Sequence, residues 1–152
     1  MTPTYFRLVV RLEYLLKKFQ DPAFDDYARA HIANYACVLL CGLLETAVRE
    51  TLSLHSERAA SPAVANYVRT QLDGFQNPNP EKIEQLVRSF DVALADQLEA
   101  FWSGEIKDAI GSIVGNRHLV AHGRDTALTL NRIWEWLTSV RSFITFLETK
   151  FS

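Results

Sequence analysis

The sequence predicts an all-α fold, an irregular helical bundle of about five to six helices, some of them short. Over most of the chain, apolar residues recur every three or four positions, which places them on one face of a helix. No segment shows the sustained alternation of apolar and polar residues that a half-buried strand requires. The chain has 152 residues, 48% of them hydrophobic, and is therefore long enough to build a core. We expect a single domain over residues 1–152.

Helical patterns follow one another with short gaps, and residues that favour helix ends separate them. Pro22 breaks the first helix, while Ser61, Asn79 and Thr129 stand where N-terminal caps are needed. Gly123 is well placed as a C-terminal cap. The expected helices cover about residues 4–20, 24–55, 62–73, 80–90, 91–102, 106–122 and 130–151.

The middle of the second helix, Ala36–Leu44, is apolar on every side, so we expect this helix to lie at the centre of the bundle. Cys37 and Cys41 fall in this run and are expected to be reduced core residues without a redox role. Glu45 borders the run. It either faces solvent or is half-buried and pairs with Arg117, because a buried charge needs a partner.

The composition limits which binding partners and which cellular locations can be expected. The net charge of −2 creates no global basic field, so any contact with RNA must depend on a local patch. The longest uninterrupted apolar run is too short to span a bilayer, and the first residues lack the apolar segment of a signal peptide. We therefore expect a cytoplasmic protein with no membrane contact.

Residues 115–123, Gly-Asn-Arg-His-Leu-Val-Ala-His-Gly, concentrate the side chains that can do chemistry. Arg117 and His122 have the spacing R-x4-H. A guanidinium binds a phosphate at two points, and an imidazole moves a proton near neutral pH. On a regular helix these two side chains lie about 140° apart. The helix must therefore end or distort near His122, or the pair must meet across a cleft or a subunit interface; Gly123 favours an ending helix.

The spacing alone is weak evidence. With 11 arginines and 4 histidines, a fixed gap is expected about 0.3 times by chance, and allowing four to six intervening residues raises this to about 0.9. The chain has a second match, Arg49 and His55, with the spacing R-x5-H. It lies toward the end of the second helix with no glycine nearby. We interpret it as a decoy and expect its mutation to leave activity intact.

The surroundings of the first pair carry more information, because they resemble the HEPN superfamily, and within it the RiboL-PSP-HEPN-like branch. The usual motif of that branch is Arg, Asn, two or three variable or aliphatic residues, Ala, His and often Gly, and residues 117–123 follow it. Residues 79–90, Asn-Pro-Glu-Lys-Ile-Glu-Gln-Leu-Val-Arg-Ser-Phe, look like a second recurring block. His118 occupies the position of the usual asparagine, while Asn116 precedes the arginine.

The resemblance implies a metal-independent endoribonuclease that acts as a homodimer, with two Arg–His pairs sharing one cleft across the two-fold axis. Arg117 would hold the scissile phosphate of the RNA substrate. His122 would transfer a proton as the 2′-hydroxyl attacks, and His118, Asn116 and Glu45 would support the site. No metal or cofactor is implied. Many such proteins are toxins or defence effectors, so an antitoxin or a nucleotidyltransferase is the expected partner.

Other interpretations remain open at this level. HEPN domains without catalysis serve as dimerisation modules or bind a nucleotide or partner. His118 and His122, four residues apart, could hold a metal on one helix face, although no HExxH pattern accompanies them. Arg117 could instead pair with a nearby acid while His122 caps helix carbonyls, which would leave a plain helical interaction domain.

Overall fold

The structure is a computed structural model that describes residues 3–152, and all regular secondary structure in this part of the chain is helical. The helices are α1 (Thr4–Lys18), α2 (Asp26–Ala59), α3 (Pro62–Leu72), α4 (Pro80–Phe90), α5 (Val92–Trp102), α6 (Glu105–Ala121) and α7 (Leu130–Lys150). The all-α prediction is confirmed. The described residues form seven helices, one for each helical range expected from the sequence, so the predicted total of five to six helices is too low. Asp91 (φ −159°, ψ 114°) ends α4 and at once caps α5 through Leu94 N, which separates two helices by a single residue.

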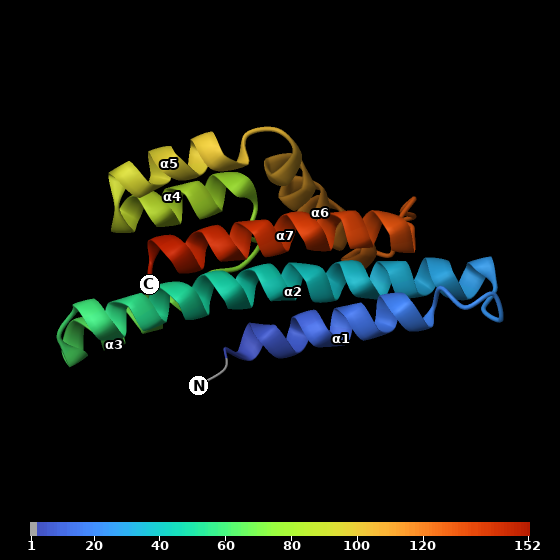
Figure 1. The fold of residues 1–152 in the computed structure, drawn as a ribbon, viewed down its shortest axis with the longest axis horizontal. Coiled ribbons are helices and arrows are strands. Elements are labelled where there is room, and N and C mark those ends of the chain that lie inside the picture. The colour runs from blue at the N-terminus through green and yellow to red at the C-terminus, as the bar shows by residue number, and fades with distance from the viewer. Residues whose placement is uncertain (1–2) are drawn as a thin grey trace.

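The long helix α2 lies at the centre, with α1 antiparallel on one side and α7 on the other (Figure 1). It also contacts α3 and α6. Its buried residues run from Ala33 to Ser56 at spacings of three and four, which places most of them on one broad face of the helix. Val38 on the other side is exposed, so α2 is central, as predicted, without being buried on every side. By length and composition alone α2 could cross a membrane, which the shorter uninterrupted apolar run did not suggest. Half of the most apolar 18-residue stretch of α2 is buried inside the structure, as in a helix that forms the core of a bundle.

Three predicted caps are confirmed by hydrogen bonds. The side chains of Ser61, Asn79 and Thr129 accept from the backbone N–H three residues later, at 3.5, 3.0 and 3.1 Å. Each cap satisfies one of the unpaired N–H groups at a helix start, which fixes where α3, α4 and α7 begin. These local signals therefore set the order and the starting points of the three helices.

Helices α4 and α5 form a hairpin that sits over one end of α7 (Figure 1). Trp102, fully buried, anchors this hairpin: its ring stacks on Phe143 of α7 with centroids 5.2 Å apart. Its indole N–H donates to Glu84 Oε1 at 2.8 Å, and Lys107 Nζ donates to the same oxygen at 3.0 Å. These contacts join α4, the end of α5, α6 and α7. They determine where α6 leaves the hairpin.

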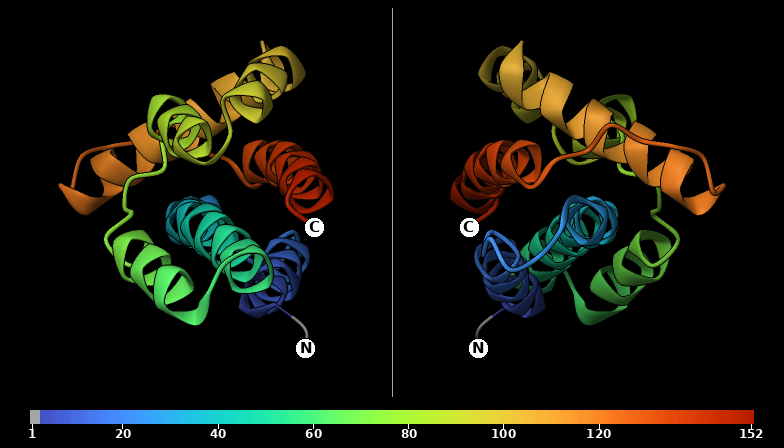
Figure 2. Two further views of the ribbon diagram at one scale, coloured as in Figure 1. Left: turned by 90° about the vertical axis from the view of Figure 1, so that its left-hand side faces the viewer. Right: turned by 90° about the vertical axis from the view of Figure 1, so that its right-hand side faces the viewer.

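Viewed along the length of the bundle, α6 crosses above α2 and carries its C-terminal end away from α7 (Figure 2). The segment joining α3 to α4 climbs past the same part of α6. This arrangement brings residues from the 73–79 turn next to the R-x4-H segment, although the two are far apart in sequence.

Candidate functional site

The end of α6 has the geometry that its sequence predicts. His122 is the C-terminal cap, and Gly123 adopts a left-handed conformation with φ 66°. The N–H of Arg124 donates to Leu119 O at 2.9 Å, and the N–H of Gly123 donates to Val120 O at 3.1 Å. These two hydrogen bonds form a Schellman motif, which closes a helix when a glycine follows the cap. The helix therefore stops one residue before His122 and leaves that side chain exposed.

Arg117 is half-buried and points toward the 73–79 turn. Its Nη1 donates a hydrogen bond to Asn77 Oδ1 at 2.9 Å. The pairing of Arg117 with Glu45 considered from the sequence is absent from residues 3–152. Glu45 Oε1 instead accepts from the backbone N–H of Asn77 at 3.2 Å, and its Oε2 lies 4.0 Å from Arg49 Nη2. Asn77 thus stands between the two residues expected to meet, with its backbone N–H bound to Glu45 and its side chain bound to Arg117.

His118 and His122 lie together on the exposed side of α6. Their ring centroids are 4.3 Å apart with the planes inclined by 57°, as expected one helical turn apart. Asn116 faces its own helix, where Nδ2 donates to Ser112 O at 2.8 Å. In the described chain, no group of three or more His, Cys, Asp or Glu side chains gathers as a metal site would require.

The structure therefore divides the predicted site residues into two groups. Arg117 and Glu45 face the turn at Asn77, whereas His118 and His122 face solvent. No hydrogen bond joins Arg117 to His122 within residues 3–152, as the angle of about 140° between them on a helix predicts. One copy of the chain presents the guanidinium and the imidazole on different sides of the end of α6.

The second Arg–His pair is engaged in the fold. Arg49 Nε donates to Phe75 O at 3.0 Å, and Nη2 donates to the same carbonyl. The His55 ring packs edge-on against Phe151 and Phe90, with centroids 5.2 and 6.5 Å away. Both side chains of this pair therefore have partners within the fold.

Asn77 is not among the site residues that the sequence indicates. Asn77 is the one non-glycine residue of the described chain with a positive φ, 53°. An asparagine directly before a proline in a turn was the available signal, since asparagine tolerates this conformation and its amide binds neighbouring groups.

The cysteines are core residues, as predicted. Both are free and buried, and Cys37 Sγ contacts Ile113 O at 3.5 Å. Burial raises the pKa of Cys37 to about 12, with a further contribution from Cys41. Burial also raises the pKa of Cys41 to about 11; Glu45 adds to this shift and Arg117 opposes it. Both thiols are therefore protonated at neutral pH and are poor nucleophiles.

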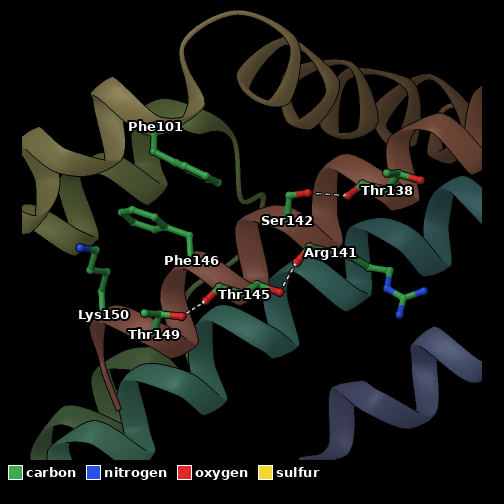
Figure 3. A pocket seen from close by; sticks show the side chains of 8 residues that line it. All are labelled: Phe101, Thr138, Arg141, Ser142, Thr145, Phe146, Thr149 and Lys150. Carbon is green, nitrogen blue, oxygen red and sulfur yellow. Dashed lines mark hydrogen bonds between the residues drawn. The ribbon is translucent and has the colours of Figure 1, made fainter.

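A groove between α5 and α7 is separate from the R-x4-H segment. It has a volume of about 560 Å³ and is bounded by Phe101 and Phe146, which stack with centroids 4.5 Å apart (Figure 3). The hydroxyls of Ser142, Thr145 and Thr149 along its floor donate to carbonyls one turn earlier in α7. No residue of 115–123 lines this groove, so it has no part in the candidate site.

A family model described as RiboL-PSP-HEPN matches residues 5–152, nearly the whole chain. No curated protein matches, and no solved structure matches. The match covers the turn at Asn77, all of α6 and the candidate site.

Proposed function

Because the chain belongs to the RiboL-PSP-HEPN family, as its sequence predicts, we propose that it is a metal-independent endoribonuclease acting as a homodimer. Its composite site uses Arg117 and His122 of both copies. Glu45, Asn116 and His118 support it, and no cofactor takes part. A non-catalytic HEPN module that dimerises and binds a nucleotide or partner is the alternative.

The observation that carries this proposal is the state of the Arg117 guanidinium. Within the described chain it forms a hydrogen bond to a neutral amide and no ion pair with a carboxylate. It keeps its positive charge and further N–H donors, which suits two-point binding of a phosphodiester. An imidazole ends the same helix, exposed and held by the Schellman motif. A charged anion binder and a proton carrier are the two groups that phosphodiester cleavage needs.

The homodimer follows from the separation of these groups. An arginine and an imidazole on different sides of one helix end form a compact site only when a second copy supplies the missing side. Gly115 lies on the exposed side of α6, and a Cβ placed there would meet no atom within 4 Å. Gly111, by contrast, faces Pro80, whose Cγ is 3.9 Å from such a Cβ. Gly115 is therefore the position at which a second α6 can approach closely.

In the proposed reaction the 2′-hydroxyl of the RNA attacks the adjacent phosphorus. His122 of one copy accepts the hydroxyl proton, and His122 of the other copy donates a proton to the departing 5′-oxygen. Arg117 stabilises the negative charge that develops on the phosphoryl oxygens. The bond from phosphorus to the 5′-oxygen breaks, which leaves a 2′,3′-cyclic phosphate upstream and a free 5′-hydroxyl downstream.

The experiment that tests this proposal measures cleavage of RNA by the purified protein under three conditions. Cleavage should persist in excess EDTA. It should stop when a single 2′-deoxy nucleotide replaces the ribonucleotide at the cut site, and the products should carry a cyclic phosphate and a 5′-hydroxyl. Loss of activity in EDTA with rescue by zinc or manganese would instead make His118 and His122 metal ligands. A pure, folded dimer that cleaves no RNA would favour the binding module.

We also propose a cellular role as a toxin or defence effector in the cytoplasm, restrained by an antitoxin or a nucleotidyltransferase. Expression of the chain alone should arrest growth. Co-expression with the product of a neighbouring gene should relieve the arrest, and growth unaffected by either would contradict this role.

A further inference from the structure

We propose that Asn77 is a positioning residue that aims the Arg117 guanidinium at the substrate phosphate while leaving its charge intact. This inference rests on the proposed function, because it assigns the residue that prepares the same site. The structure supports it through the backbone of the turn, the chemistry of the acceptor and the placement of Glu45.

The backbone of the turn is fixed on both sides of Asn77. Phe75 O accepts from Arg49 Nε at 3.0 Å, and Gln76 O accepts from Lys82 Nζ at 3.2 Å. The N–H of Asn77 donates to Glu45 Oε1 at 3.2 Å, and its carbonyl accepts from Asn79 N at 2.7 Å. Pro78, the next residue, is buried. An exposed side chain on so constrained a backbone keeps a defined direction.

The conformation of Asn77 is one that most residues avoid. At φ 53° a Cβ lies close to the neighbouring backbone, and only glycine and, less often, asparagine or aspartate visit this region readily. The surrounding hydrogen bonds maintain this conformation. In this conformation Asn77 Oδ1 lies 2.9 Å from Nη1 of Arg117, a residue of α6 that follows 40 positions later in the chain.

A neutral acceptor has an advantage at this position. A carboxylate bound directly to Arg117 would hold the guanidinium equally well, but it would neutralise its charge and compete with the phosphate. The carbonyl of an amide orients the guanidinium without cancelling that charge. The carboxylate of Glu45 instead accepts a hydrogen bond from the backbone N–H of Asn77 and lies beside Arg49.

The charges of Glu45 and Arg117 also act on a common neighbour. Both act on the buried thiol of Cys41, Glu45 raising its pKa and Arg117 lowering it. The two opposite charges therefore lie near one another without a direct ion pair, and Asn77 occupies the connection between them. The series Glu45, Asn77 and Arg117 links α2 to the candidate site on α6.

The test compares two substitutions of Asn77 with a control in the same turn. Asn77→Gly keeps the positive φ and removes the acceptor. We expect kcat to fall on the order of ten- to a hundred-fold, the range for residues that orient a catalytic group. Asn77→Asp keeps the acceptor but adds a charge, so we expect kcat to be largely preserved while KM rises. Asn79→Ser keeps an N-terminal cap on α4 and should leave cleavage unchanged.

A measurement on the free protein separates this inference from the proposed function. In the wild type, NMR should show slowed rotation of the Arg117 guanidinium, and Asn77→Gly should abolish that slowing while the helical content stays the same. If Arg117→Ala and His122→Ala leave cleavage intact, the proposed function fails. If they abolish cleavage while Asn77→Gly changes neither the guanidinium signals nor kcat, the positioning role is overturned.

Discussion

The two Arg–His pairs of this chain, at the ends of α2 and α6, have nearly the same spacing and different surroundings. At the end of α2, Arg49 is bound to a backbone carbonyl and lies near Glu45, and His55 packs among aromatic rings. At the end of α6, the hydrogen bond that Arg117 forms within residues 3–152 goes to a neutral amide, and His122 is exposed.

The comparison teaches that partners, more than spacing, distinguish a structural pair from a candidate catalytic one. A guanidinium that already satisfies a main-chain carbonyl has little to offer a phosphate, because moving it would leave that carbonyl unpaired. The predictions below test this difference, beginning with the largest expected effect.

Substitution at the end of α6 should remove activity and leave stability nearly unchanged. We expect Arg117→Ala and His122→Ala each to lower kcat/KM by about 100-fold or more, since one removes charge stabilisation and the other removes proton transfer. His55→Ala is the matched control and should cleave RNA at the wild-type rate. Cleavage assays and thermal melting on the same samples would check both. If His55→Ala abolished cleavage while Arg117→Ala and His122→Ala did not, the Arg–His pair on α2 would be the functional one.

Substitution at the end of α2 should do the opposite and reduce stability first. Arg49→Ala leaves Phe75 O without its side-chain donor, and we expect the free energy of unfolding in urea to fall by about 1–3 kcal/mol. The sequence-based expectation that Arg49→Ala leaves activity intact needs revision, because Arg49 also fixes the turn that carries Asn77. We expect a partial loss of cleavage that Arg49→Lys, which retains a donor, reduces. A fully stable and inactive Arg49→Ala would make Arg49 part of the chemistry.

The end of α6 depends on Gly123, whereas no glycine marks the end of α2. With φ 66°, Gly123→Ala should lower the free energy of unfolding by about 1–2 kcal/mol. Because the Schellman motif also places His122, kcat should fall too. Chemical denaturation and cleavage assays would measure the two effects. Unchanged values of both would show that the motif does not position the histidine.

Gly115 distinguishes the isolated chain from the proposed dimer. Within one chain an alanine there meets no atom within 4 Å and favours the helix by about 0.5–1 kcal/mol. At a close interface between two copies of α6, the same methyl group should weaken dimerisation. We expect light scattering to show a lower dimer fraction for Gly115→Leu than for the wild type, with Gly115→Ala between them. A wild type that is monomeric at high micromolar concentration would contradict the composite site.

The last effect concerns stability alone and comes from the buried thiols of Cys37 and Cys41. The pKa values of Cys37 and Cys41 are raised to about 12 and 11, so the folded state retains these protons where the unfolded state loses them. The free energy of unfolding should therefore decrease as the pH rises above about 9 and approach its limit near the folded pKa values. Substituting serine at both positions should remove this dependence, as urea unfolding at pH 8 and pH 10 would show.

Local signals in the sequence were enough to place most of the fold. The caps at Ser61, Asn79 and Thr129 and the glycine at 123 act on groups within about four residues, so they can be recognised without any tertiary contact. Asp91 was harder, because one residue there ends a helix and starts the next, and the apolar pattern continues across it.

The sequence by itself determined the helices, the central position of α2, the family and the two candidate Arg–His pairs. Only the tertiary structure decided how those pairs differ, because their partners are distant in sequence: Phe75 lies 26 residues from Arg49, and Asn77 lies 40 residues from Arg117. Periodicity and capping act over a few residues, whereas the surroundings of a guanidinium depend on how the 73–79 turn packs between α2 and α6. The orientation of Arg117 by a neutral amide is a property of that packing.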